Sequence, residues 1–198
     1  MLLALLLAKQ GVNVTILEGS DKLDDNPRAA HYAPSACVDL DRAGILDDIH
    51  AQGIVPNGVR WLKQDGTVIC ELEGDAIGKD YRHKMVCLPL NFVCQILYKH
   101  LQKQPTVEVK WEHKVTGLGQ DEGKAWVDVE TPSGTDRCEA DYIVGCDGAN
   151  SQIRRSLFGD FNFPGWSWDE QIVATNVGES PAGRAPFVRL QRDVEHFG

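Results

Sequence analysis

The sequence predicts an α/β fold in which short strands and helices alternate around a partly parallel sheet. Residues 1–17 read as an apolar helix, a glycine and a β-branched strand, an order typical of crossover units. Residues 140–155, ADYIVGCDGANSQIRR, place an apolar run before a glycine turn and a new helix. Open α/β sheets bind ligands at such strand ends. Short strand patterns over 115–140 add a β-meander before that last predicted strand.

Composition narrows the class of protein. The hydrophobic fraction of 42% over 198 residues is sufficient for a globular core. A net charge of −9 without a basic block argues against a nucleic-acid partner. The six cysteines form no CxxC pair, which favours reduced thiols in an intracellular protein. The opening MLLALLLAKQG lacks signal-peptide features and is too short to span a bilayer, so a buried helix is predicted there.

Glu18 is the first candidate binding residue. A helix is predicted over 1–10, stopped by Gly11, and a strand over 12–17 leads directly to Glu18. In dinucleotide-binding βαβ units the acid at the end of the second strand binds ribose hydroxyls. The alternative for Glu18 is a solvated carboxylate at a strand end.

The remaining elements follow from periodicity and turn residues. Apolar spacing predicts helices over 35–51, interrupted at Gly44, and over 91–104. Asp65-Gly66 predicts a hairpin within 58–73. Further strands are predicted over 107–111, 115–118, 125–130 and 136–140. We expect residues 12–17, 107–111 and 142–144 to form parallel strands of one sheet.

The turn after residues 142–144 carries the second group of candidates. Gly148 allows close approach of the backbone to a ligand. Asp147 can accept hydrogen bonds from ribose hydroxyls or orient a water beside a pyrophosphate. Ser151 and Arg154 can close the turn. A bare Asp-Gly is most often a plain turn, but the longer pattern DGxxSxxR is far more specific.

DYIVGCDGANSQIRR resembles the DG motif of the class A flavoprotein monooxygenases, the single-component FAD-dependent aromatic hydroxylases. The resemblance extends over about residues 1–177. It implies a Rossmann-like, glutathione-reductase-like FAD-binding domain with an inserted β-meander and part of a β-rich substrate domain. The implied FAD-binding domain is 1–160, with 58–88 contributing to the substrate domain that starts at 161–198.

The same resemblance implies further FAD contacts. The Arg28-Ala29 pair lies where the family places such a pair along the FAD, with Arg28 at the pyrophosphate or ribitol region. Asn91 stands where the family often carries Gln or Arg at the start of a helix. Val115 matches a residue whose backbone touches the adenine, although a plain meander residue is an equal alternative. The implied cofactor-binding residues are Glu18, Arg28, Ala29, Asn91, Val115, Asp147 and Gly148.

The implied activity is hydroxylation of a small aromatic or polycyclic substrate with FAD, NAD(P)H and O2. The sequence contains no nucleophile or metal-ligand constellation that argues for hydrolysis or metal catalysis. Two alternatives stay open. One is a non-catalytic, truncated remnant of such an enzyme, and the other is a related flavoprotein such as a halogenase or a reductase.

Two family motifs are not found in the printed sequence. The strand and GxGxxG loop that should precede the first helix are absent, as is a later Gly-Asp motif, and the resemblance stops near Glu179. A mis-called start codon, a truncated gene or a fragment would explain this. Because two of three FAD anchor regions are missing, we expect residues 1–198 alone to bind FAD only weakly and to lack hydroxylase activity.

Overall fold

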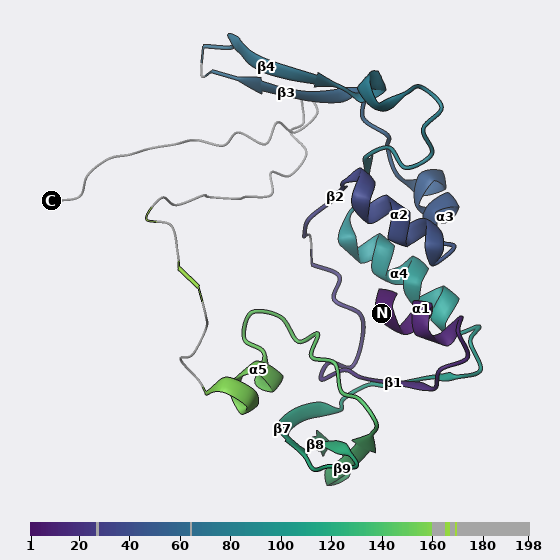
Figure 1. The fold of residues 1–198 in the computed structure, drawn as a ribbon, viewed down its shortest axis with the longest axis vertical. Helices are drawn as coiled ribbons and strands as arrows, with labels where there is room; N and C mark the ends of the chain where they lie inside the picture. The colour runs from purple at the N-terminus through teal and green to yellow at the C-terminus, as the bar shows by residue number, and fades with distance from the viewer. Residues whose placement is uncertain (27, 64, 160–164, 167–168, 170–198) are drawn as a thin grey trace, which may run out of the picture.

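The computed structural model describes residues 1–26, 28–63, 65–159, 165–166 and 169 (Figure 1). Its helices are α1 (Leu2–Ala8), α2 (Pro34–Arg42), α3 (Leu46–Gln52), α4 (Leu90–Leu101) and α5 (Gln152–Phe158), with a 3₁₀ turn η1 (Gly74–Ile77). Its strands are β1 (Val14–Leu17), β2 (His31–Tyr32), β3 (Gly58–Leu62), β4 (Val68–Glu73), β5 (Val86–Cys87), β6 (Val107–Lys110), β7 (Lys114–Gln120), β8 (Ala125–Thr131) and β9 (Gly134–Ala140).

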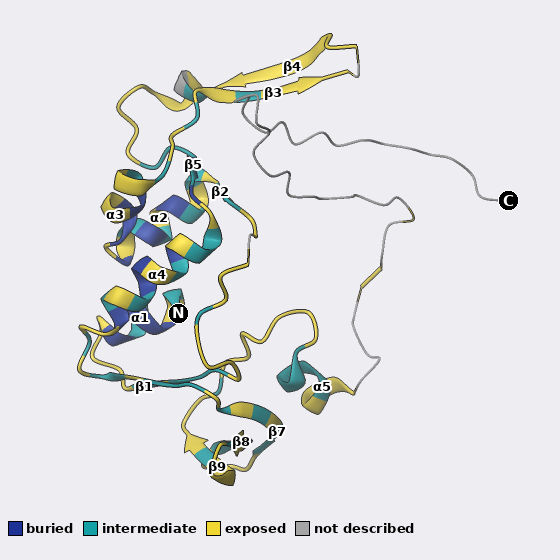
Figure 2. Cartoon of the chain, turned by 180° about the vertical axis from the view of Figure 1, so that it is seen from behind, coloured by how far each residue is buried: buried dark blue, intermediate teal, exposed yellow. Residues whose placement is uncertain are grey.

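The hydrophobic core lies among helices α1 to α4, which form the middle of the molecule (Figure 2). Apolar residues at helical spacing bury one face of α4. The fully buried side chains include Leu5 on α1 and Leu46 and Ile49 on α3. Helices too short to be stable alone therefore gain their stability from mutual packing.

Strands β1 and β6 form the predicted parallel pair. The register runs from Val14 opposite Val107 to Leu17 opposite Lys110. Val14, Ile16 and Val107 pack against the helical core, so the two strands bury one face under α1 and its neighbours. The fold class and this part of the sheet are confirmed.

The break in the second predicted helix is also confirmed. Gly44 separates α2 from α3 and has a φ of +71°, a conformation that favours glycine. The Gly44 N–H donates to the carbonyl of Asp41, and the Ile45 N–H donates to the carbonyl of Leu40. The turn therefore provides hydrogen-bond donors for carbonyl groups at the end of α2, and α3 begins directly after it.

A short antiparallel pair, β2 with β5, was not expected from the polar sequence around it. His31 lies opposite Cys87, Tyr32 lies opposite Val86, and the Leu88 N–H donates to the Ala30 carbonyl at 2.8 Å. The pairing fixes the segment after Arg28 beside the start of α4.

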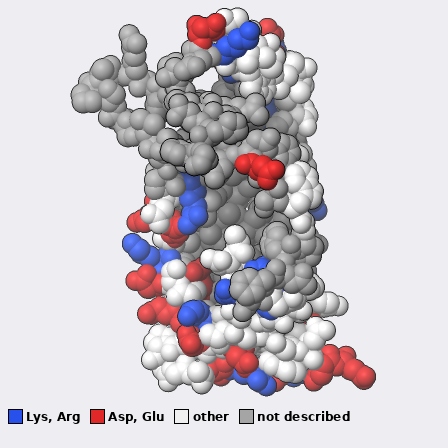
Figure 3. All heavy atoms as spheres, turned by 90° about the vertical axis from the view of Figure 1, so that its left-hand side faces the viewer, with Lys and Arg blue, Asp and Glu red and all other residues white. Residues whose placement is uncertain are grey.

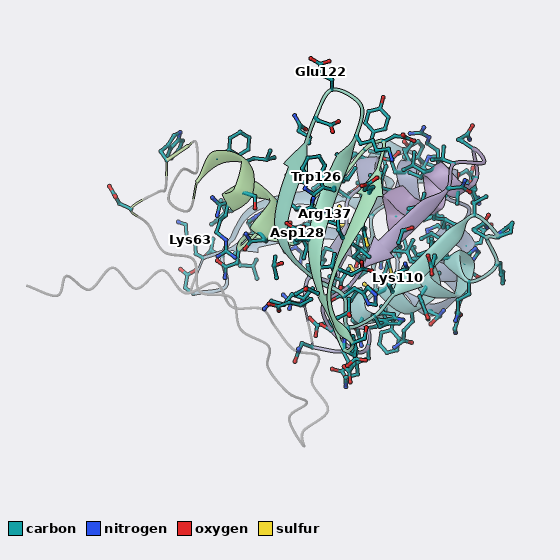
Figure 4. The ribbon with its side chains drawn as sticks, turned by 90° about the horizontal axis from the view of Figure 1, so that it is seen from below. Lys63, Lys110, Glu122, Trp126, Asp128 and Arg137 are labelled. Carbon is teal, nitrogen blue, oxygen red and sulfur yellow. The ribbon has the colours of Figure 1, made fainter. Side chains whose placement is uncertain are left out.

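The hairpin β3–β4 and the meander β7–β9 lie at opposite ends of the molecule, with the helices between them (Figure 1). In the hairpin, Gly66 takes a φ of +89° at the predicted turn. In the meander, the Trp126 ring lies over Gly119, where an added Cβ would come within 2.5 Å of the indole. Figure 4 shows Trp126, Arg137 and Asp128 together, and the Arg137 guanidinium lies 5.1 Å from the Trp126 ring centroid.

The predicted strand over residues 142–144 is wrong. These residues form no ladder in the part of the chain that the structure describes, and Tyr142 and Val144 are 87% and 59% exposed. A strand is stabilised by hydrogen bonds to a neighbouring strand. The parallel pair β1–β6 supplies no such partner to this segment, so it follows the end of β9 as an extended, unpaired run.

The surface of the described residues carries charges of both signs. Acidic and basic side chains are interspersed on the face that Figure 3 shows. Within the described ranges, no helix is long and apolar enough to cross a membrane. The six cysteines are free thiols.

Candidate functional site

Glu18 lies at the carboxyl end of the parallel pair, directly after β1. Its N–H donates to the Lys110 carbonyl at 3.0 Å, and its carbonyl accepts from the His113 N–H at 2.8 Å. The side-chain Oε1 accepts from the Ser20 N–H at 2.9 Å. Among the described residues, Oε2 has no hydrogen-bond partner. The backbone is therefore fixed on both sides while one carboxylate oxygen stays available.

Val115 lies close to this corner of the sheet. It sits near the start of β7, opposite Val129 of β8, and is half-buried. Gly19 lies against Lys114, the residue before Val115. A Cβ added to Gly19 would lie 3.5 Å from the Cβ of Lys114. The turn between β6 and β7 thus brings Glu18 and Val115 to the same edge.

Arg28 and Ala29 are both exposed, in the segment that leads into β2. Nε and Nη2 of Arg28 donate to Oδ2 of Asp24 at 2.8 and 2.6 Å. The Ala30 carbonyl accepts a hydrogen bond from the N–H of Leu88, the residue that follows β5. The Arg28–Ala29 pair therefore lies on the same side of the core as the first turn of α4.

Asn91 occupies that first turn, and its Oδ1 is buried without a hydrogen-bond partner in the described residues. The hydroxyl of Tyr32 on β2 is buried without a partner in the same way. Burial raises the pKa of the Tyr32 hydroxyl, and the nearby Cys94 thiol on α4 adds to this effect. Unpaired buried polar atoms are unfavourable, so each of these two atoms suits a polar ligand group.

Tyr32 was missed by sequence reasoning. It stands in a polar stretch without periodicity, and the β2–β5 pairing that turns it toward α4 involves only two residues of each strand. No signal in the sequence alone identifies it.

Asp147 has a local role in the structure. Oδ1 accepts from the Ser151 hydroxyl at 2.6 Å, and Oδ2 accepts from the N–H groups of Gln152 and Ile153 at 2.6 and 3.2 Å. Burial raises the pKa of Asp147, but the hydrogen bonds from Ser151, Ile153 and Gln152 outweigh it, so the pKa is lowered. The carboxylate therefore caps the first turn of α5 together with the N-cap residue Ser151.

The turn around Asp147 depends on two glycines. Gly148 has a φ of +78° with open space around it, so its backbone is accessible. At Gly145 an added Cβ would come within 2.9 Å of Cβ of Ile153 on α5. The turn is closed by Ser151, whose Oγ accepts from the backbone N–H of Arg154 at 3.0 Å, whereas a charged hydrogen bond from the Arg154 side chain stays a prediction.

The candidate residues thus fall into two groups. Glu18 and Val115 share the corner formed by β1, β6 and β7, and α5, which follows the Asp147 turn, packs against β7. Arg28 and Asn91 lie with Ala29 near the β2–β5 pair. In the described part of the chain, no three His, Cys, Asp or Glu side chains lie together in a way that could hold a metal ion.

Comparison with known families identifies the class of protein. Residues 1–183 match the family described as "FAD binding domain". The chain belongs to this family, and its cofactor is FAD. This match, together with the relatives and the solved structure described next, confirms the resemblance to the class A flavoprotein monooxygenases.

Two curated relatives come from the genus Pseudomonas. The para-nitrophenol 4-monooxygenase of Pseudomonas sp. strain WBC-3 is 33% identical over 178 residues, which are 89% of this chain and 44% of the relative. The 6-hydroxy-3-succinoylpyridine 3-monooxygenase HspB of Pseudomonas putida is 34% identical over 185 residues, covering 89% of this chain and 45% of the relative. The chain therefore spans less than half the length of these relatives.

Solved structures show the same relationship. The p-nitrophenol 4-monooxygenase PnpA from Pseudomonas putida DLL-E4 matches with a TM-score of 0.75 and 30% identity, over 87% of this chain and 42% of that one. PqsL of Pseudomonas aeruginosa, described as a probable FAD-dependent monooxygenase, shares the fold with a TM-score of 0.71 at 20% identity, over 91% of this chain and 48% of that one.

The residues present fit FAD. Glu18 keeps a free carboxylate oxygen, which suits a ribose hydroxyl. The guanidinium of Arg28 is partly free and suits a phosphate. The unpaired polar atoms of Asn91 and Tyr32 suit a group that both donates and accepts hydrogen bonds, as a sugar-chain hydroxyl does.

Proposed function

We propose that this chain is the FAD-binding part of a monooxygenase that hydroxylates a small aromatic or polycyclic substrate with NAD(P)H and O2. Bound FAD supplies the redox chemistry, and the protein binds, orients and shields it. The names of the relatives, a nitrophenol and a succinoylpyridine monooxygenase, support this class of substrate. The single observation that carries the proposal is Glu18, fixed at the end of the parallel pair with one carboxylate oxygen free.

The proposed cofactor-binding residues have distinct roles. Glu18 accepts hydrogen bonds from the adenosine ribose, and Arg28 contacts a phosphate with Ala29 beside it. Asn91 accepts a hydrogen bond from the ribitol chain. Val115 borders the adenine through its backbone. Asp147 holds the turn that presents the open backbone at Gly148, and this indirect role follows from its capping hydrogen bonds.

The test is a fluorescence titration of FAD against residues 1–198. We expect weak, saturable binding that the substitution Glu18→Ala weakens roughly ten-fold, as for loss of a charged hydrogen bond. Glu122→Ala is the matched control, because Glu122 is an exposed acidic residue at the tip of the β7–β8 turn (Figure 4). A wild-type chain that binds no FAD would contradict the proposal.

A non-catalytic remnant is the second candidate function, and the exposed segment after β9 favours it. Both candidates predict no substrate-dependent NAD(P)H oxidation by residues 1–198 alone. Oxidation together with a hydroxylated phenol would exclude the remnant. A halogenated product would instead indicate the related halogenases.

We also propose that residues 58–88 contribute to the substrate domain, next to an FAD-binding domain of residues 1–160. The hairpin β3–β4 supports this, because Trp61, Ile69 and Leu72 are large apolar residues that remain exposed. Such a surface suits packing against further protein or an apolar ligand. Residues 161–198, proposed as the start of the substrate domain, lie almost entirely outside the described residues.

A further inference from the structure

We propose that Asp24 is a positioning residue that holds the Arg28 guanidinium so that its remaining N–H groups face a phosphate of the cofactor. This rests on the proposed function, in which Arg28 contacts the FAD pyrophosphate. Asp24 is not proposed to touch the cofactor itself. It acts through Arg28.

The two carboxylate oxygens of Asp24 bind different residues. Oδ1 accepts from the backbone N–H and the side-chain Nδ2 of Asn26, at 3.0 and 2.5 Å. Oδ2 accepts from Nε and Nη2 of Arg28, at 2.8 and 2.6 Å. The first pair of bonds fixes the carboxylate on its own turn, and the second fixes the guanidinium on the carboxylate.

This arrangement leaves the outer edge of Arg28 available. A guanidinium has five N–H groups, and Asp24 engages one on Nε and one on Nη2. Both N–H groups of Nη1 and the second of Nη2 have no partner among the described residues. Those are the groups that form the two-pronged contact with phosphate oxygens, so the ion pair orients Arg28 without consuming it.

The charge state of Asp24 suits this role. The hydrogen bond from the Asn26 backbone N–H, followed by that from Arg28, holds the pKa of Asp24 below its ordinary value. The carboxylate is therefore ionised at neutral pH. The side chains of Arg28 and Asp24 are 61% and 45% exposed, so either one can be replaced without opening the core.

The neighbouring Asp25 provides a matched control. It carries the same charge one residue away and lies 3.6 Å from Lys22, in an exposed pair that does not involve Arg28. The substitution Asp25→Asn removes the same charge as Asp24→Asn. A general electrostatic effect would be equal in the two variants, whereas a positioning effect belongs to Asp24 alone.

The first measurement compares the affinities of FAD and riboflavin, which lacks both phosphates. We expect Asp24→Asn to weaken FAD binding about three-fold, in keeping with an exposed ion pair, and to leave riboflavin binding unchanged. Arg28→Ala should weaken FAD binding roughly ten-fold. Adding Asp24→Asn to Arg28→Ala should then have no further effect, because the residue that Asp24 positions is gone.

The second measurement needs no cofactor. In ¹⁵N-labelled protein, the Nε–H resonance that disappears in Arg28→Ala belongs to Arg28. We expect Asp24→Asn to move this resonance toward those of solvent-exposed arginines, and Asp25→Asn to leave it in place. An Arg28 Nε–H chemical shift that is unchanged in Asp24→Asn would overturn the inference, whatever the FAD titration shows.

The outcomes separate this inference from the proposed function. Wild-type binding with unchanged FAD affinity in Asp24→Asn overturns the positioning role alone. Tighter FAD binding in Asp24→Asn also overturns it, because Asp24 would then compete with the phosphate for Arg28. A wild-type chain that binds no FAD overturns the proposed function and the positioning role together.

Discussion

Two apolar runs in this chain each lead to an acidic residue, and the two have different structures. Val14–Leu17 pairs with β6, packs against the helical core and ends at Glu18. Residues 142–144 have no ladder partner in the described chain and lead to Asp147. Glu18 keeps a carboxylate oxygen free, whereas both oxygens of Asp147 are engaged at the start of α5.

The difference shows what an apolar run needs in order to become a strand. Both runs contain β-branched residues, so local preference alone does not separate them. Only the first has a neighbouring strand on one edge and a helical layer on one face. The acid after the fixed strand end keeps one carboxylate oxygen free, whereas the acid after the unpaired run caps the helix that follows it.

The largest expected effect contrasts the core beside β1 with the exposed run. Leu5 on α1 is fully buried, and α1 packs against β1. Leu5→Ala should lower the free energy of unfolding by about 3 kcal/mol, because it removes buried contacts and leaves a cavity. Val144→Ala should change it by less than about 0.5 kcal/mol. Urea unfolding measures the free energy of unfolding of both variants. Equal losses in the two would contradict the difference between the buried core and the exposed run.

A smaller effect is expected at Gly145, where the unpaired run meets α5. A Cβ at this position would lie 2.9 Å from Cβ of Ile153, so Gly145→Ala must displace the helix. We expect Gly145→Ala to destabilise the packing of α5 by about 2 kcal/mol, which is typical of overpacking. This loss should be measured as faster amide exchange throughout α5. The neighbouring Cys146 is exposed, and unaltered exchange in Cys146→Ala is the control.

The capping role of Asp147 predicts a pH dependence. Because its pKa is lowered in the folded state, Asp147 stabilises α5 above its unfolded pKa. That stabilisation is lost as the pH falls through the lower folded pKa. Below about pH 4, the protection of the Gln152 and Ile153 amides, measured as the intrinsic exchange rate divided by the observed rate, should begin to fall.

Asp147→Ala tests the same role at neutral pH. It should raise exchange at these two amides about five-fold, as expected for loss of a cap worth about 1 kcal/mol. Protection that is independent of both pH and the substitution would show that Asp147 does not cap the helix.

The sequence alone predicted most of the fold for identifiable reasons. Helical periodicity identified α4, Gly44 located the break between α2 and α3, and Asp65-Gly66 located the hairpin turn. Parallel pairing of β1 with β6 followed from the order of the elements. These features depend on local patterns, which a single sequence displays directly.

Features that depend on distant partners could not be predicted from the sequence. Residues 142–144 have a strand-like composition, yet pairing depends on a neighbour that periodicity does not reveal. The β2–β5 pair joins segments more than fifty residues apart, so the position of Tyr32 was not foreseeable. The ion pair of Arg28 with Asp24 is set by a turn at Asn26, within a stretch that has no periodic signal.

The role proposed for Glu18 is to bind the adenosine ribose of FAD. The most direct test compares FAD with FMN, which retains the flavin, ribitol and one phosphate but lacks the adenosine. Glu18→Ala should weaken FAD binding roughly ten-fold, as for loss of a charged hydrogen bond, and leave FMN binding unchanged. Equal losses for the two ligands, or no loss for FAD, would contradict the assignment of Glu18 to the ribose.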